Sequence, residues 1–213
     1  MTEAATLPQA CLQRLSAWAA AGERKILGLV APPGAGKSTF AQAIHTAFPS
    51  HSQIVPMDGF HLANVELVRL GRTARKGAAD TFDAGGFLNL LHRIKAQTPE
   101  EVIYAPDFRR DLEEAVAGAI VVLASTPLII VEGNYLLADD APWAGLRGVL
   151  DEVWYLDVDE AIRQERLLHR HMQWGRTREA ALAWMASTDA PNARWIETTR
   201  HRADRFIDWN QAG

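Results

Sequence analysis

A glycine-rich turn between an apolar strand and a helix constrains the fold of this chain more than any other feature. Residues 25–31, KILGLVA, form a continuous apolar run, which is typical of a strand covered on both faces. The segment 31–38, APPGAGKS, follows directly, and residues 38–48 then alternate at helical period. The spacing of residues 31–38 is that of the Walker A motif, with Ala31 in place of the usual first glycine. The pattern predicts a phosphate-binding loop between a buried strand and a helix.

Each residue type in this turn has a physical role. Gly34 and Gly36 permit backbone torsions that turn successive N–H groups inward around a phosphate. Lys37 supplies a positive charge for the β- and γ-phosphates, and Ser38 offers a hydroxyl ligand to Mg²⁺ at the positive end of the helix. We therefore expect ATP to bind at Pro33, Gly34, Ala35, Gly36, Lys37, Ser38 and Thr39. The alternative is a glycine turn with a solvated lysine, and in both cases Lys37 should project into open space.

The remaining pattern predicts an α/β protein. Strands are expected at 53–57, 101–104, 127–131 and 152–158, less clearly at 119–123, and at the sheet edge at 205–209, with a loop at Pro106. Helices are expected before Gly22 and at 38–48, 87–95 and 159–172, and from about Arg178 and Pro191. Apolar strands that alternate with helices predict an open parallel sheet with helices on both faces, the P-loop NTPase fold. We expect one domain, residues 1–213, with a small helical lid at about 163–190.

Composition limits the functional class. A net charge of −4 argues against a nucleic-acid binder, although a local basic cluster can still bind a small anion. The single cysteine, Cys11, excludes an intramolecular disulfide and a cysteine metal cluster, and it suits a reducing compartment. The first residues lack the features of a signal peptide, and polar residues and a proline interrupt the longest apolar stretch, 117–131. We expect a soluble cytoplasmic protein without a membrane partner.

Two acidic residues follow predicted strands directly. Asp58 precedes Gly59, and Glu132 precedes Gly133. Because the carboxyl ends of parallel strands meet at one edge of the sheet, both carboxylates should emerge near the phosphate loop. Phosphoryl transfer to an alcohol needs a bound metal and usually a carboxylate that accepts the hydroxyl proton. The alternatives are a helix N-cap for Asp58 and a structural ion pair for Glu132.

Basic residues gather in two segments. The first contains Arg69, Arg72, Arg75 and Lys76, and it could equally be a solvated face. It precedes Asp83, which could bind the hydroxyls of a sugar or polyol, or cap the next helix. The second surrounds Gly175 and contains Arg163, Arg166, Arg170, Arg176 and Arg178. Arginines on a mobile element can close over ATP, although pairing along a helix is an alternative for each of them. His61, His169, His171 and His201 do not have the spacing of a metal site.

Several segments together resemble the phosphoribulokinase/uridine kinase family, which also includes bacterial pantothenate kinase. They are APPGAGKST (31–39), MDGFH (57–61), RKGAADTFD (75–83), YAPDF (104–108), VEGNYLL (131–137), GR (175–176) and PNA (191–193). The combination looks closest to a small bacterial branch labelled fructose transport system kinase or nucleoside kinase-like. Departures are the missing nucleoside-binding inserts, the missing N-terminal region of pantothenate kinase, and the position of Cys11 outside the phosphate loop. The identity of the substrate therefore does not carry over.

The resemblance implies roles for individual residues. Asp58 would be the catalytic base, Glu132 would organise Mg²⁺ together with Ser38, and Asp83 would touch the acceptor. Lys37, Arg170 and Arg176 complete the candidate catalytic set. The candidate acceptor-binding residues are Asp83, Arg75, Lys76, Tyr104 and His61.

The sequence thus favours an ATP- and Mg²⁺-dependent kinase that acts on a small hydroxyl-bearing metabolite, such as a sugar, a nucleoside or a pantothenate-like compound. A nucleotide hydrolase or GTPase-like switch is a first alternative, but the chain has no Asn-Lys-x-Asp segment to read guanine. A nucleotide-sensing accessory of a sugar transport system is a second. The acceptor, the oligomeric state and any effector stay open.

Overall fold

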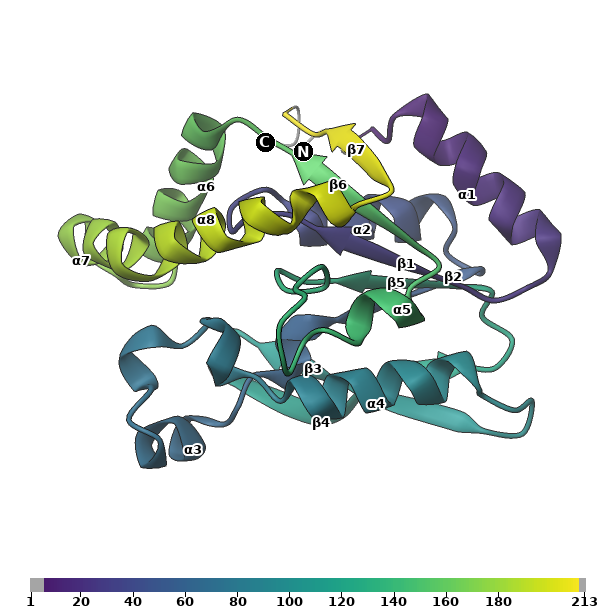
Figure 1. The fold of residues 1–213 in the computed structure, drawn as a ribbon, viewed down its shortest axis with the longest axis horizontal. Helices are drawn as coiled ribbons and strands as arrows, with labels where there is room; N and C mark the ends of the chain where they lie inside the picture. The colour runs from purple at the N-terminus through teal and green to yellow at the C-terminus, as the bar shows by residue number, and fades with distance from the viewer. Residues whose placement is uncertain (1–5, 211–213) are drawn as a thin grey trace.

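Five parallel strands form the central sheet, in the order β2–β5–β1–β6–β7 (Figure 1). The computed structural model describes residues 6–210. The strands are β1 (Lys25–Val30), β2 (Ser52–Pro56), β5 (Leu128–Glu132), β6 (Glu152–Asp157) and β7 (Arg205–Asp208). The predicted parallel sheet is confirmed, and its last strand lies at an edge as expected.

The register of the sheet brings the ends of three strands together. Strand β5 lies between β1 and β2, so that Glu132 is paired with Leu29 on one side and with Pro56 on the other. The phosphate loop follows β1 directly, and Asp58 lies two residues beyond the end of β2. Both predicted acidic strand ends therefore lie at the edge of the sheet that carries the loop.

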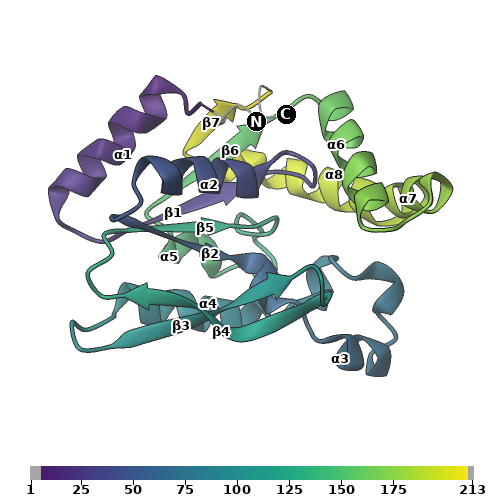
Figure 2. The ribbon, with the colours of Figure 1, turned by 180° about the vertical axis from the view of Figure 1, so that it is seen from behind.

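Helices cover both faces of the sheet because the strand side chains alternate between two apolar layers. Along β6, Trp154 faces a layer with helices α1 (Gln9–Ala21) and α2 (Lys37–Ala47). Tyr155 faces the opposite layer, which contains α4 (Ala84–Lys95), α5 (Leu146–Val149) and α8 (Ala190–Thr199). Figure 2 shows α1 and α2 from their own side of the sheet. Alternation of this kind is what a strand buried on both faces requires.

Two antiparallel strands, β3 (Val102–Arg109) and β4 (Glu114–Leu123), form a separate hairpin outside the parallel sheet. The predicted strands 101–104 and 119–123 were too short, and the predicted loop at Pro106 was wrong. The strand continues through Pro106 with a shift in register between Ala105 and Asp107. A two-stranded ribbon tolerates proline because one side of each strand needs no hydrogen-bond partner.

Three further helices lie at one end of the molecule. They are α3 (Asn64–Arg69), α6 (Glu160–Gln173) and α7 (Arg178–Trp184), and both views show α3 and α7 projecting from the same end (Figures 1 and 2). A π-helical turn, Met185–Asp189, joins α7 to α8. The His171 ring, in α6, pairs with the Asp189 carboxylate at 2.8 Å.

No helix within residues 6–210 is long and apolar enough to cross a membrane.

Candidate active site

The phosphate loop has the backbone geometry that its glycines predicted. Gly34 and Gly36 adopt φ angles of 83° and 81°, which non-glycine residues rarely occupy. A Cβ atom on Gly34 would lie 2.5 Å from the carbonyl oxygen of Arg163, so helix α6 lies directly against the loop. On Gly36 it would lie 3.3 Å from the indole nitrogen of Trp209. The loop is therefore held between α6 and the residues that follow β7.

Lys37 begins helix α2 but does not project into open space as expected. Its ammonium group donates hydrogen bonds to the carbonyl oxygens of Ala31, at 2.9 Å, and Pro32, at 3.4 Å. Burial lowers the pKa of this lysine to about 8, while the negative charges of Glu132 and Asp58 oppose the shift. The ammonium group is thus held by the backbone at the start of the loop, and a phosphate bound there would take over the role of the two carbonyl groups.

The Ser38 hydroxyl donates a hydrogen bond to Glu132 Oε1 at 2.9 Å. Glu132 is buried, and its burial, followed by the charge of Asp58, raises its pKa above the ordinary value. A hydroxyl and a carboxylate oxygen at this separation suit Mg²⁺, which takes few protein ligands and completes its shell with water and phosphate oxygens. Ser38 and Glu132 therefore fit the predicted metal role. Pro33 and Ala35 are buried, whereas Ser38 and Thr39 are exposed at the start of α2.

Asp58 lies in a 3₁₀ turn, Met57–Phe60, at the end of β2. Its carboxylate forms an ion pair with Arg110 at 3.2 Å. Its carbonyl oxygen accepts a hydrogen bond from the His61 ring at 2.7 Å. The Asp58 side chain does not cap the turn, so the ion pair replaces the N-cap alternative. The charge of Asp58 acts on both Lys37 and Glu132, which places the carboxylate in the same electrostatic cluster.

The two candidate catalytic arginines occupy different surroundings. Burial lowers the pKa of the Arg170 guanidinium, and the charge of Arg110 lowers it further. The carboxylates of Asp58 and Glu132 act on Arg170 in the opposite direction, as expected for an arginine next to the acids. Arg176 instead lies over the ring of Trp184, 3.9 Å from its centroid. In this conformation the structure brings Arg170 to the site but does not bring Arg176 there.

The other lid arginines also differ in placement. Arg163 is buried in α6, and Arg166 donates to the carbonyl oxygen of Asn210 at 3.2 Å. Arg178 is exposed at the start of α7. Helix α6, which carries Arg163 and Arg166, packs against the phosphate loop at Gly34 and Gly36, and its movement as a lid stays a prediction.

The predicted acceptor residues fall into two groups. His61 lies close to the site, between the rings of Phe82 and Phe108, whose centroids are 4.0 and 4.7 Å from its own. Lys76 lies over the same Phe108 ring, at 5.1 Å. Tyr104 is 58% exposed on the outer face of the hairpin, paired with Val121. His61 and Lys76 therefore share a wall beside Asp58, whereas Tyr104 lies on the exposed face of the hairpin, away from that wall.

Arg75 and Asp83 already have structural partners. Arg75 forms an ion pair with Asp80 at 2.7 Å. Asp83 Oδ1 accepts a hydrogen bond from the Gly86 amide at 2.8 Å, so this residue caps helix α4. The cap uses one carboxylate oxygen of an exposed side chain, and contact of Asp83 with an acceptor stays a prediction.

Sequence reasoning missed Arg110 and Tyr135. Arg110 comes two residues after the YAPDF segment, and its position at the turn of a hairpin could have marked it. The Tyr135 hydroxyl donates to the carbonyl oxygen of Gly77 at 2.6 Å and so ties the strand end after β5 to the basic segment. Tyr135 lies in the VEGNYLL segment, but periodicity gave no signal for this contact.

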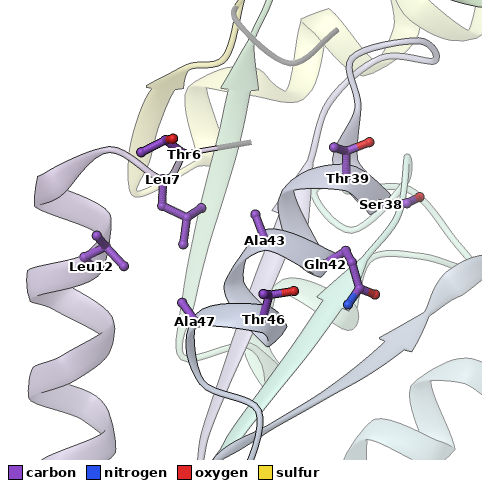
Figure 3. Close-up of a pocket in the computed structure, with 9 residues that line it drawn as sticks. All are labelled: Thr6, Leu7, Leu12, Ser38, Thr39, Gln42, Ala43, Thr46 and Ala47. Carbon is purple, nitrogen blue, oxygen red and sulfur yellow. The ribbon is translucent and has the colours of Figure 1, made fainter. Parts of the chain in front are cut away.

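A groove of about 730 Å³ lies between helices α1 and α2 (Figure 3). Its lining includes Leu12 from α1 and Thr39, Gln42 and Thr46 from α2. The groove starts at the phosphate loop but has neither Asp58 nor Glu132 in its lining. It therefore does not hold the hydroxyl that would be phosphorylated.

A phosphate-binding loop at the end of the central strand of a parallel sheet places this chain among the P-loop proteins. The chain belongs to the phosphoribulokinase/uridine kinase family, whose sequence profile matches residues 26–211. The fold and family predicted from the sequence are confirmed.

Individual relatives agree with this assignment. A Schizosaccharomyces pombe protein, provisionally named a uridine kinase, is 36% identical over 186 residues, which cover 82% of this chain and 79% of the relative. The uncharacterized YggC of Escherichia coli K12 is 34% identical over 195 residues, covering 89% and 80% of the two chains. A crystal structure from Silicibacter sp. TM1040, provisionally named a fructose transport system kinase, has a TM-score of 0.83 at 36% identity. It covers 94% of this chain and 99% of that one.

Proposed function

We propose that this chain is an ATP- and Mg²⁺-dependent kinase that transfers the γ-phosphate to a hydroxyl group of a small metabolite. The observation that carries the proposal is the position of Asp58. Asp58 belongs neither to the loop nor to the Ser38–Glu132 pair, yet it lies two residues beyond the end of β2, whose last residue, Pro56, is paired with Glu132. A carboxylate beside the γ-phosphate position is what an alcohol acceptor needs for removal of its proton.

The residues would divide the work as follows. The loop amides and Lys37 would bind the phosphates, and Ser38 and Glu132 would hold Mg²⁺, which neutralises phosphate charge when bound. Asp58 would accept the hydroxyl proton while the new bond between the acceptor oxygen and the γ-phosphorus forms. The bond from that phosphorus to the bridging oxygen breaks, and ADP leaves with the electron pair. Arg170 would stabilise charge on the transferred group.

A sugar, a nucleoside or a pantothenate-like compound stays the proposed acceptor class. The provisional names of the relatives, uridine kinase and fructose transport system kinase, support this range. We also propose a cytoplasmic location, because Cys11 is free and buried, as suits a reducing compartment.

The test is an ADP-release screen against sugars, nucleosides, pantothenate and glycerate, with three variants beside the wild type. Lys37→Ala should weaken ATP binding and nearly abolish turnover. Asp58→Asn keeps the shape of the side chain but removes its basicity, so kcat should fall by ~10²–10⁴ while ATP binding survives. Asp111→Asn is the matched control, because Asp111 is exposed on the hairpin turn and pairs with Arg109.

Each alternative has its own outcome. A folded Asp58→Asn enzyme that keeps more than about a tenth of wild-type kcat would refute the role of Asp58 as base, given the range above. Acceptor-independent ATP hydrolysis would indicate a nucleotide hydrolase. ATP binding without turnover on any acceptor would indicate a nucleotide-sensing accessory protein.

A further inference from the structure

The hairpin brings Arg110 to the candidate base. Arg110 follows the last residue of β3, and its guanidinium donates to Asp58 Oδ2 at 3.2 Å. The backbone holds the two segments together, since a Cβ atom on Gly59 would lie 2.3 Å from the carbonyl oxygen of Pro106. The contact between the hairpin and the 3₁₀ turn therefore keeps the backbone of Arg110 close to Asp58.

The pair itself is exchangeable. The side chain of Arg110 is 40% exposed and that of Asp58 is 33% exposed. Ion pairs this accessible to water contribute little stability, so a competing anion can replace the Asp58 carboxylate at Arg110. Within residues 6–210, Asp58 is the only carboxylate that forms an ion pair with Arg110.

Positive groups gather around one aromatic ring next to this pair. Arg110 lies over the Phe108 ring at 5.6 Å, and Lys76 lies over it at 5.1 Å. Lys76 donates to the Asn64 side chain at 2.7 Å and to the backbone carbonyl of Glu113, which are uncharged partners. The Glu114 carboxylate is already engaged by the Asn64 amide, at 2.9 Å. Arg110 and Lys76 therefore place two positive groups on this wall of the site, with the carboxylates of Glu113 and Glu114 close to Lys76.

The ion pair conflicts with the proposed role of Asp58. The Arg110 guanidinium occupies Asp58 Oδ2, one of the two oxygens that could accept a proton. That oxygen becomes available to the hydroxyl proton only after Arg110 has moved to another anion. The hydroxyl that Asp58 is proposed to activate cannot supply that anion. A second, anionic group of the acceptor can, and Lys76 lies over the same Phe108 ring as Arg110 to bind it. A phosphate of ATP is the competing anion, and an experiment without nucleotide distinguishes the two.

We propose that the acceptor carries an oxyanion, a carboxylate or a phosphate, in addition to its hydroxyl, and that Arg110 binds this group. The inference rests on the proposed kinase function and names its substrate class. Without the acceptor, Arg110 stays on Asp58 and limits the loss of ATP to water. When the acceptor binds, Arg110 moves to its oxyanion and Asp58 becomes free to accept the hydroxyl proton. Recognition of the acceptor and activation of the base are then a single event.

The first experiment measures ADP release with matched acceptor pairs that differ in one anionic group. Glycerate is compared with glycerol to test a carboxylate, and fructose 6-phosphate with fructose to test a phosphate. The wild type should prefer the anionic member of one pair, and that pair identifies the oxyanion. Arg110→Met should raise the KM for that acceptor by roughly 10- to 100-fold, as the loss of a charged hydrogen bond implies. The KM for ATP should stay unchanged, and ATP hydrolysis without acceptor should rise.

Arg109→Met is the matched control, because Arg109 is the neighbouring residue and pairs with Asp111 at 3.1 Å. It should leave both KM values at the wild-type level. Preference for the neutral member of both pairs, or an unchanged KM in Arg110→Met, would overturn the inference while leaving the kinase function intact.

A second experiment separates the inference from the proposed function. Glycerate and fructose 6-phosphate are added to the nucleotide-free protein and the thermal unfolding midpoint is measured. One of them should stabilise the wild type and Arg109→Met but not Arg110→Met. If this difference appears without any turnover, the anion site stands and the kinase function falls. If neither compound acts through Arg110 in either experiment, the inference falls.

Discussion

The Ser38 hydroxyl and the Glu132 carboxylate meet at 2.9 Å, although 94 residues separate them in the chain. The contact joins the start of α2 to the end of β5 and forms the oxygen pair that fits Mg²⁺. We expect Glu132→Gln to raise the Mg²⁺ concentration needed for half-maximal turnover by about 10-fold or more. The variant keeps an oxygen acceptor for Ser38 but loses the charge. A Mg²⁺ titration of ADP release measures the effect, and thermal shift with Mn²⁺ reports binding without turnover.

Glu152→Gln is the control for this change. Glu152 is also buried, but it lies at the opposite end of the sheet with Arg14 and Arg205 as partners. Its replacement should lower stability without changing the Mg²⁺ requirement. An unchanged requirement in Glu132→Gln would restrict Glu132 to a structural partner of Ser38.

Replacing Arg170 and replacing Arg176 should have different effects on kcat, because the two side chains occupy different surroundings. Arg170→Ala should lower kcat by ~10²-fold or more, as the removal of one charge-stabilising donor typically does. Arg176→Ala should keep kcat near the wild-type value and lower the unfolding midpoint, because it loses the contact with Trp184. Single-turnover kinetics and thermal unfolding of both variants check this. Loss of kcat in a normally stable Arg176→Ala protein would show that lid closure brings Arg176 to the phosphates.

Asp83 offers a test that separates capping from binding. Asp83→Ala should destabilise the protein by ~0.5–2 kcal/mol through loss of the cap on α4, whereas Asp83→Asn should lose much less. If the second carboxylate oxygen also holds the acceptor, both variants should raise the acceptor KM more than the ATP KM. Thermal unfolding measures the loss of the helix cap, and two-substrate kinetics measure the two KM values. A normal acceptor KM in Asp83→Asn would leave the residue as a cap alone.

Acid should destabilise the protein through His61. Burial lowers the pKa of this ring, and the positive charges of Lys76 and Arg110 lower it further, against the opposing charge of Asp58. The unfolded chain therefore takes up the proton first as pH falls below about 6.5, the ordinary value for histidine. Stability is complete above that pH and is lost as pH falls through the folded pKa.

The measurement compares unfolding midpoints at about pH 7.5 and about pH 5.5, on either side of the ordinary histidine pKa. We expect His61→Asn to show a smaller decrease than the wild type, because it cannot be protonated. His169→Asn, at an exposed position on α6, should behave like the wild type. An identical decrease in His61→Asn would assign the acid sensitivity to other groups.

The sequence predicted those parts of the site that depend on neighbouring residues. The strand, the two glycines and Lys37 form one continuous segment, and Asp58 and Glu132 each follow their own strand. The register of β5 between β1 and β2 then brings the three strand ends together, as parallel strands of similar length require. These relationships follow from local pattern and from general rules of sheet topology.

The contacts that sequence did not reveal depend on distant segments. The pairing of Arg110 with Asp58 requires the full hairpin, whose first strand continues through Pro106 against the usual preference of that residue. The stacking of Arg176 on Trp184 depends on the turn at Gly175, where φ is 90°. The side-chain directions of Arg110 and Arg176 are decided by packing between segments that are distant in the chain. A local sequence pattern therefore does not predict them.

The close approach of α6 to Gly34 has a thermodynamic consequence. The same helix carries Arg170, so its backbone touches the loop while its side chain reaches the acids. Any tilt of α6 that an occupied acceptor site favours must also alter the loop that is proposed to hold ATP. Affinities for the two substrates are then linked and reciprocal: each must change the dissociation constant of the other by the same factor. The affinity of such a protein for its nucleotide would therefore depend on whether the acceptor site is occupied.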